Sequence, residues 1–97
     1  MKLPSNDIEL IKQVLKGKPV KRAFLFGSFI RGEADRNSDV DILVELDYSK
    51  HIGIGFVKIK NQLEEALNKK VDLVSENSLS HHILPFINQD KLLIYER

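Results

Sequence analysis

The stretch from residue 24 to residue 44 constrains this chain most. It reads FLFGSFIRGEADRNSDVDILV, an apolar run, a Gly-Ser step, a polar loop and a second apolar run that opens with Asp39-Val40-Asp41. Successive side chains of a β-strand point to opposite faces, so Asp39 and Asp41 project from one face. At ~3.3 Å per residue, the two residues are roughly 6.5 Å apart along the backbone. The carboxylates repel each other unless a cation or a donor lies between them, which suits a divalent metal ion.

The Gly27-Ser28 step ends the first of these two strands. Residues 29–31 can form a short helical turn there, which leaves backbone N–H groups free beyond the strand end, and such groups bind phosphate. A phosphate site beside a metal site is what nucleotidyl transfer needs. One turn later, Arg31 can reach a phosphate or a carboxylate, and a surface ion pair is the alternative.

Composition limits the classes of protein that the sequence can encode. The 97 residues predict one domain with one core, spanning 1–97. Lys and Arg total 15 against 14 Asp and Glu, and this net charge of +1 gives no indication of nucleic-acid binding. The absence of cysteine excludes disulfides and thiolate metal sites. Neither a signal peptide nor a membrane-spanning apolar run is present, so we expect a cytoplasmic protein.

The periodicity of apolar residues predicts alternating helices and strands. Asn6 and Glu9 fit a capping box for the first helix. Pro85 is expected to kink the last helix or to split it into separate turns. The order of elements indicates an α/β fold of the two-layer α+β type, with a mixed sheet flanked by helices. We expect helices over 5–16, 54–69 and 78–88, and strands over 20–26, 39–44, 70–74 and 92–95.

Some residues outside the central stretch are predicted to lie at the surface. His51 falls in a polar loop over 47–53 and is expected to be exposed. Phe29, Phe56 and Phe86, with the apolar C-terminus, exceed what so small a core can cover. We therefore expect a homo-oligomer or a hetero-oligomer.

The central stretch resembles the signature of a known family. Gly27-Ser28, ten intervening residues that include Arg31, and then Asp39-x-Asp41 are similar to the signature of the minimal nucleotidyltransferases of the DNA polymerase β superfamily. Spacing, residue types and strand context all agree, and the resemblance covers most of the chain. It implies a nucleotidyltransferase fold in a single catalytic domain.

The same resemblance implies a third carboxylate. Residues 71–74 read Val-Asp-Leu-Val, which resembles the strand that brings the third acidic residue in this family. Asp72 would then complete a triad with Asp39 and Asp41. The alternative is a solvent-facing Asp on an edge strand.

The resemblance also implies a reaction and a partner. Two Mg²⁺ ions about 3.5–4 Å apart would be held by Asp39, Asp41 and Asp72. Gly27, Ser28 and Arg31 would bind the nucleotide. The implied reaction transfers AMP from ATP to a hydroxyl acceptor, a tyrosine of a partner HEPN-type toxin, so that the chain would be the antitoxin of a toxin–antitoxin pair.

A second function remains open at this point. A small chain can neutralise a partner by binding it, with no catalysis, while keeping the same fold. The intact set of acidic residues favours the enzyme. A polymerase or tRNA-modifying role is disfavoured by the near-neutral charge.

Overall fold

A four-stranded mixed sheet organises the molecule. The computed structural model describes residues 2–50 and 52–97. The elements are α1 (Ser5–Leu15), β1 (Val20–Phe26), α2 (Ser28–Arg31), β2 (Val40–Leu46), α3 (Gly55–Leu67), β3 (Val71–Ser75), the 3₁₀ turn η1 (Glu76–Ser78), α4 (Leu84–Asp90) and β4 (Leu92–Glu96). The strand order is β3-β2-β1-β4, with β2 parallel to β3 and β1 antiparallel to both β2 and β4. The predicted α+β fold with a mixed sheet is confirmed.

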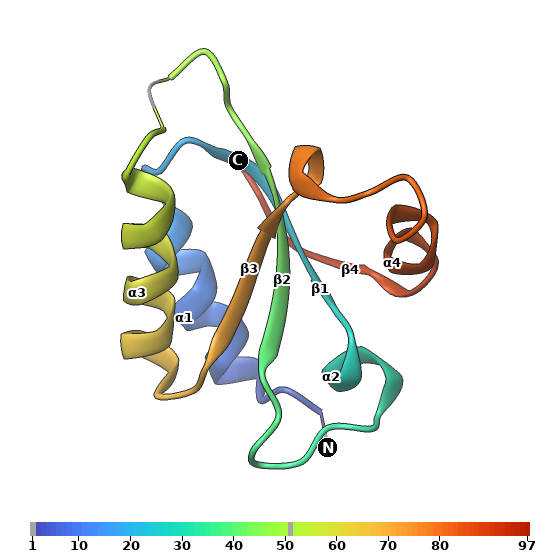
Figure 1. Ribbon diagram of the computed structural model, residues 1–97. Helices are drawn as coiled ribbons and strands as arrows, with labels where there is room; N and C mark the ends of the chain where they lie inside the picture. Colours follow the sequence, from blue (N-terminus) through green and yellow to red (C-terminus); the bar gives the residue numbers. More distant parts are fainter. Residues whose placement is uncertain (1, 51) are drawn as a thin grey trace.

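The two long helices cover one face of the sheet (Figure 1). Ile11 and Leu15 of α1 and Ile59 and Leu63 of α3 are fully buried. They pack in one cluster with the side chains at alternate positions of β2, namely Val40, Ile42 and Val44. Each such side chain contributes about 1.5–3 kcal/mol on burial. This face therefore supplies most of the stability and fixes the sheet.

The opposite face carries only a small apolar cluster. Phe24 of β1, Leu43 of β2 and Ile87 of α4 are buried together there. The ammonium of Lys91 lies 4.2 Å from the centroid of the Phe24 ring, a cation–π contact that adds to the anchoring of α4. On this side the described chain has only the short elements α2, η1 and α4 (Figure 1), so part of the face is left open.

The predicted capping box of the first helix is wrong. The helix begins at Ser5 directly after Pro4, and no side chain caps it. The Pro4 carbonyl accepts from the N–H groups of Asp7 (3.0 Å) and Ile8 (3.3 Å), so Asn6 already lies inside the helix. Glu9 instead pairs with Lys12 at 3.3 Å.

The prediction for Pro85 is also corrected. The helix runs from Leu84 to Asp90, and Pro85 stands in its first turn. The N–H that proline lacks would have no intrahelical acceptor at that position, so Pro85 starts the helix and does not interrupt it.

The three phenylalanines that suggested oligomerisation differ in their surroundings. Phe29 is buried and Phe56 packs against the main core, while Phe86 is 72% exposed. The prediction for His51 lies outside the described residues. No helix of the described chain is long and apolar enough to cross a membrane.

The main core gives a first test of this architecture. We expect Leu63→Ala to lower the free energy of unfolding by about 2–5 kcal/mol, because the side chain is fully buried and its removal leaves a cavity. Val57→Ala on the same helix is the matched control. Val57 is 53% exposed, so its loss should lie within about 0.5 kcal/mol. Urea denaturation measures both, and equal losses would contradict the assignment of this helix face to the core.

Candidate active site

A row of side chains crosses three strands on the open face of the sheet. In the register of the sheet, Asp41 of β2 stands opposite Phe26 of β1 and beside Asp72 of β3. Asp39 precedes β2 directly, two residues before Asp41. The structure therefore brings together the three carboxylates that the sequence singled out. Asp39 and Asp72 are exposed, whereas Asp41 is half-buried.

Two hydrogen bonds fix the start of β3 beside the start of β2. The N–H of Val40 donates to the carbonyl of Lys70 (2.9 Å). The N–H of Val71 donates to the carboxylate of Glu64, which reaches over from α3 (2.9 Å). Parallel pairing then places Asp72 next to Asp41. Asp72 does lie on an edge strand, as an ordinary surface residue would. What distinguishes it is that its neighbour on β2 is another carboxylate, that of Asp41.

The surroundings of Asp41 raise its pKa from 3.8 to about 6. Burial has the largest effect, followed by the negative charges of Asp72 and Asp39, while the positive charge of Arg31 acts in the opposite direction. The negative charges that make Asp41 hard to ionise would also attract a cation, and a bound cation would favour the ionised form of Asp41.

Gly27 is required by the closeness of Asp41. Its φ of 78° lies in the region that favours glycine. A Cβ at this position would collide with the Asp41 carboxylate, whose Cγ would be only 3.0 Å away. The backbone of the Gly-Ser step can approach the carboxylate only because no side chain stands between them.

The short helix α2 follows Gly27 as expected. The N–H groups of Ile30 and Arg31 donate to the Gly27 carbonyl, each at 3.1 Å. Ser28 and Phe29 hold the first two helical positions, where an N–H has no intrahelical acceptor. The side chain of Arg31 pairs with Glu33 at 3.0 Å, and its positive charge lowers the pKa of Asp41. The role of Arg31 in nucleotide binding stays a prediction.

A cleft of about 450 Å³ opens at this place. One part of its wall comes from the predicted site, namely Phe26, Gly27, Arg31 and Asp41. The remaining wall comes from α4 and the residue before it, and consists of Ile83, Phe86, Ile87, Gln89 and Asp90. The cleft is large enough for a small molecule such as a nucleotide.

The carboxylates suit a magnesium ion by their chemistry. Mg²⁺ prefers oxygen ligands and is bound by one or two carboxylates together with substrate phosphates and water. Within residues 2–50 and 52–97, no three His, Asp or Glu side chains stand close enough to hold a metal ion. The oxygen donors fit the ion by their chemistry, but their side chains do not form a metal cage in this arrangement, and the metal role of Asp39, Asp41 and Asp72 stays a prediction.

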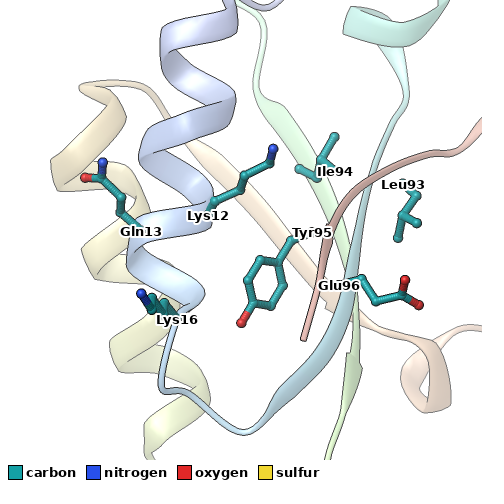
Figure 2. Close-up of a pocket in the computed structure, with 7 residues that line it drawn as sticks. All are labelled: Lys12, Gln13, Lys16, Leu93, Ile94, Tyr95 and Glu96. Atoms are coloured by element: carbon teal, nitrogen blue, oxygen red, sulfur yellow. The ribbon is translucent and has the colours of Figure 1, made fainter.

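Another hollow, of about 480 Å³, lies between α1 and the edge strand β4 (Figure 2). Lys12, Gln13 and Lys16 line it from the helix, and the ring of Tyr95 faces them from the strand (Figure 2). None of the predicted site residues lines this hollow. This hollow is therefore separate from the candidate active site.

Residues 9–97 match the family described as polymerase beta, nucleotidyltransferase. This chain belongs to that family. It is 47% identical over 75 residues to MJ0435 of Methanocaldococcus jannaschii, a protein named as a protein adenylyltransferase, with 76% of this chain and 80% of that protein covered. It is 41% identical over 64 residues to protein adenylyltransferase MntA of Thermococcus cleftensis, covering 66% and 64%.

Solved structures agree with the sequence relatives. A crystal structure of a toxin–antitoxin with AMP-PNP superposes with a TM-score of 0.77 at 27% identity, covering 98% of this chain and 75% of the matched one. The resemblance to minimal nucleotidyltransferases is thereby confirmed, and the chain is a nucleotidyltransferase enzyme.

One wall of the cleft is formed by α4, and the sequence did not predict it. Ile83, Phe86 and Gln89 line the cleft, although they lie more than forty residues after Asp41. Phe86 had been noticed only as apolar surface. No motif marks these residues, since their place depends on how α4 packs on the sheet.

The raised pKa of Asp41 predicts a stability change with a definite sign. Because the folded-state pKa of about 6 exceeds the ordinary 3.8, the folded protein loses stability as the pH rises from about 4 to about 6. Two pKa units correspond to about 3 kcal/mol, which solvent screening of the half-buried group reduces to about 1–2 kcal/mol. Asp41→Asn should therefore stabilise the metal-free protein by about 1–2 kcal/mol at pH 7.5 and by little at pH 4.

Asp47 offers a control of opposite sign. Hydrogen bonding to Ser49 and the ion pair with Arg97 (2.7 Å) hold the pKa of Asp47 well below its usual range. Its stabilisation is present at neutral pH and is lost on acidification, so Asp47→Asn should destabilise the protein at pH 7.5. Thermal unfolding at both pH values measures the two variants. A loss of stability in Asp41→Asn at pH 7.5 would contradict the conclusion that the charge of Asp41 destabilises the folded protein.

Two glycines allow a matched test of the close approach at Gly27. Gly32 has φ 76° and ψ 13°, the left-handed conformation in which alanine is strained by about 1–2 kcal/mol. Gly27 has φ 78° and ψ −149°, a conformation essentially restricted to glycine, so alanine is strained more there. Nothing lies within 4 Å of a Cβ at Gly32, whereas one at Gly27 meets Asp41. We expect Gly27→Ala to destabilise more and to reduce nucleotidyl transfer at least tenfold, while Gly32→Ala retains transfer. Equal transfer by the two variants, measured with nucleotide consumption, would contradict this requirement.

Proposed function

We propose that this chain is a protein adenylyltransferase that transfers AMP from ATP to a tyrosine hydroxyl of a HEPN-type toxin and thereby acts as its antitoxin. The observation that carries the proposal is that Asp41, which pairs with Asp72 across the strands, shares one cleft with Gly27 and Arg31. The relatives named as protein adenylyltransferases, and the similar toxin–antitoxin structure with AMP-PNP, support the donor and the kind of partner.

The nucleotide would bind through its phosphates near α2. The backbone N–H groups of Ser28 and Phe29 and the hydroxyl of Ser28 can donate to phosphate oxygens. Arg31 supplies a positive charge at the wall of the cleft. In this arrangement Glu33 loses its ion pair with Arg31 to the phosphates. Binding by these residues orients the α-phosphorus toward the carboxylates.

Mg²⁺ ions, when bound by Asp39, Asp41 and Asp72, would neutralise the phosphates and lower the pKa of the acceptor hydroxyl. Asp72 is exposed at the edge of the sheet, where an acceptor can reach it. Its carboxylate accepts the proton of the tyrosine hydroxyl as general base. The tyrosine oxygen forms a bond to the α-phosphorus, the bond from that phosphorus to the bridging oxygen breaks, and pyrophosphate leaves.

The acceptor would have to be a separate protein. Asp39 and Asp72 are both exposed, so the acidic row is open to a macromolecule and not only to a small substrate. A tyrosine side chain on a partner can enter from the β3 edge, while the cleft beside β1 stays available for the nucleotide.

A mass measurement tests this proposal directly. The chain is incubated with ATP, Mg²⁺ and the HEPN-type protein encoded beside it, and the intact mass of that protein is measured. We expect a gain of one or more AMP units, located on tyrosine by fragmentation. Asp41→Asn should reduce the transfer by about 10³-fold, because it removes a carboxylate that would hold the Mg²⁺ needed to stabilise the anionic transition state.

The same variant separates catalysis from neutralisation by binding. If both versions form a stable complex with the partner and neither adds AMP, the proposal of transfer is wrong and the chain acts by binding alone. Omission of Mg²⁺ with excess chelator is the control for metal dependence. Undiminished transfer without a divalent ion would contradict the roles given to Asp39 and Asp41.

A further inference from the structure

One wall of the cleft has chemistry that the proposed transfer does not use. Phe86 is 72% exposed and Ile83 is 52% exposed, and both line the cleft that contains Asp41. Gln89 and Asp90 add polar groups to the same wall. An aromatic ring left in solvent at the mouth of a candidate active site indicates contact with a ligand.

These side chains lie on one face of α4. Phe86 and Gln89 are three residues apart, and Phe86 and Asp90 are four apart, so the helix places them as neighbours. The helix is fixed to the sheet by Ile87, which borders the same cleft and is buried against Phe24 and Leu43. The ring of Phe86 is therefore held at the cleft by a helix that is anchored to the sheet.

We propose that this wall is the nucleobase site, in which the ring of Phe86 stacks on the adenine of ATP and the side-chain amide of Gln89 reads its edge. The inference rests on the proposed function and adds the source of its preference for adenine. Stacking of a base on an aromatic side chain is favourable for every base. The carboxamide of glutamine can accept from the adenine N6 amino group and donate to N7, which distinguishes adenine from other bases.

The form of the cleft favours a nucleotide over an acceptor side chain. A nucleotide is one molecule with a charged end and a flat apolar end. The cleft joins Gly27 and Arg31 to Phe86 and Ile83 in one volume of about 450 Å³, so it offers a complementary wall for each end. The acceptor keeps the β3 edge, where Asp72 is exposed.

Binding measurements with two ligands test the base site. Isothermal titration of the full chain with ATP and with inorganic tripolyphosphate, both with Mg²⁺, separates contacts to the base from contacts to the phosphates. We expect Phe86→Ala to weaken ATP binding about tenfold or more and to leave tripolyphosphate binding unchanged. Phe86→Trp should retain the affinity for ATP. Leu92→Ala is the matched control, because Leu92 is 50% exposed but does not line the cleft.

The role of Gln89 is tested by comparing ATP with inosine triphosphate, whose base lacks the amino group. The wild-type chain should prefer ATP, and Gln89→Ala should bind the two nucleotides equally. An equal loss of ATP and tripolyphosphate affinity in Phe86→Ala would overturn the proposal, since it would show a general structural effect. Unchanged ATP affinity with reduced transfer to the partner would also overturn it and would assign the wall to the acceptor.

Failure of the two proposals can be told apart. If ATP binding depends on Phe86 and Gln89 as described, but no AMP reaches the partner protein, the proposed transfer is wrong and the base site stands. If transfer occurs and ATP affinity is insensitive to both substitutions, the base site is wrong and the transfer stands.

Discussion

The repulsion among three carboxylates at one edge of the sheet is the constraint around which the site is built. Asp41 is held between Asp39 and Asp72 in a half-buried position, and its pKa is raised to about 6 by burial and by its neighbours. Such a cluster lowers the stability of the ligand-free fold at neutral pH. The register of β2 and β3 fixes Asp41 beside Asp72 in spite of this repulsion, and a bound cation would offset it.

The two faces of the sheet divide the work of stability and function. One face is filled by α1 and α3 and holds the large cluster of buried residues. The other has a small cluster around Phe24 and Leu43, which anchors α4 and leaves the neighbouring row open. The stability that the well-packed face supplies offsets the cost of mutually repelling charges and an exposed aromatic ring on the open face.

In this member of the nucleotidyltransferase family, the parts of the candidate site lie close together. The Gly-Ser step follows the end of β1, and the carboxylates stand at the adjacent starts of β2 and β3. In the proposed reaction, the acceptor would come from another protein and the nucleotide would bind in the cleft beside α4. Specificity for the base and specificity for the partner then rest on different edges of the same site.

The sequence by itself predicted the class of fold, most of its elements and the five candidate residues of the central stretch, Gly27, Ser28, Arg31, Asp39 and Asp41. It could do so because these depend on local order: alternation places Asp39 and Asp41 together, and Gly27 precedes a short turn. The capping box failed because the helix begins at Ser5, directly after Pro4, so that Asn6 lies inside it. The kink at Pro85 failed because nothing local showed that the helix begins there.

Only the tertiary structure decided which distant residues meet. Asp72 stands beside Asp41 because β3 returns parallel to β2, and the family resemblance, not the periodicity, had pointed to it. The close contact of Gly27 with Asp41 and the cleft wall from Phe86 and Gln89 had no signal in the sequence. Such contacts depend on the register of strands and on the packing of α4, which are fixed by many residues at once, whereas a motif records only neighbours along the chain.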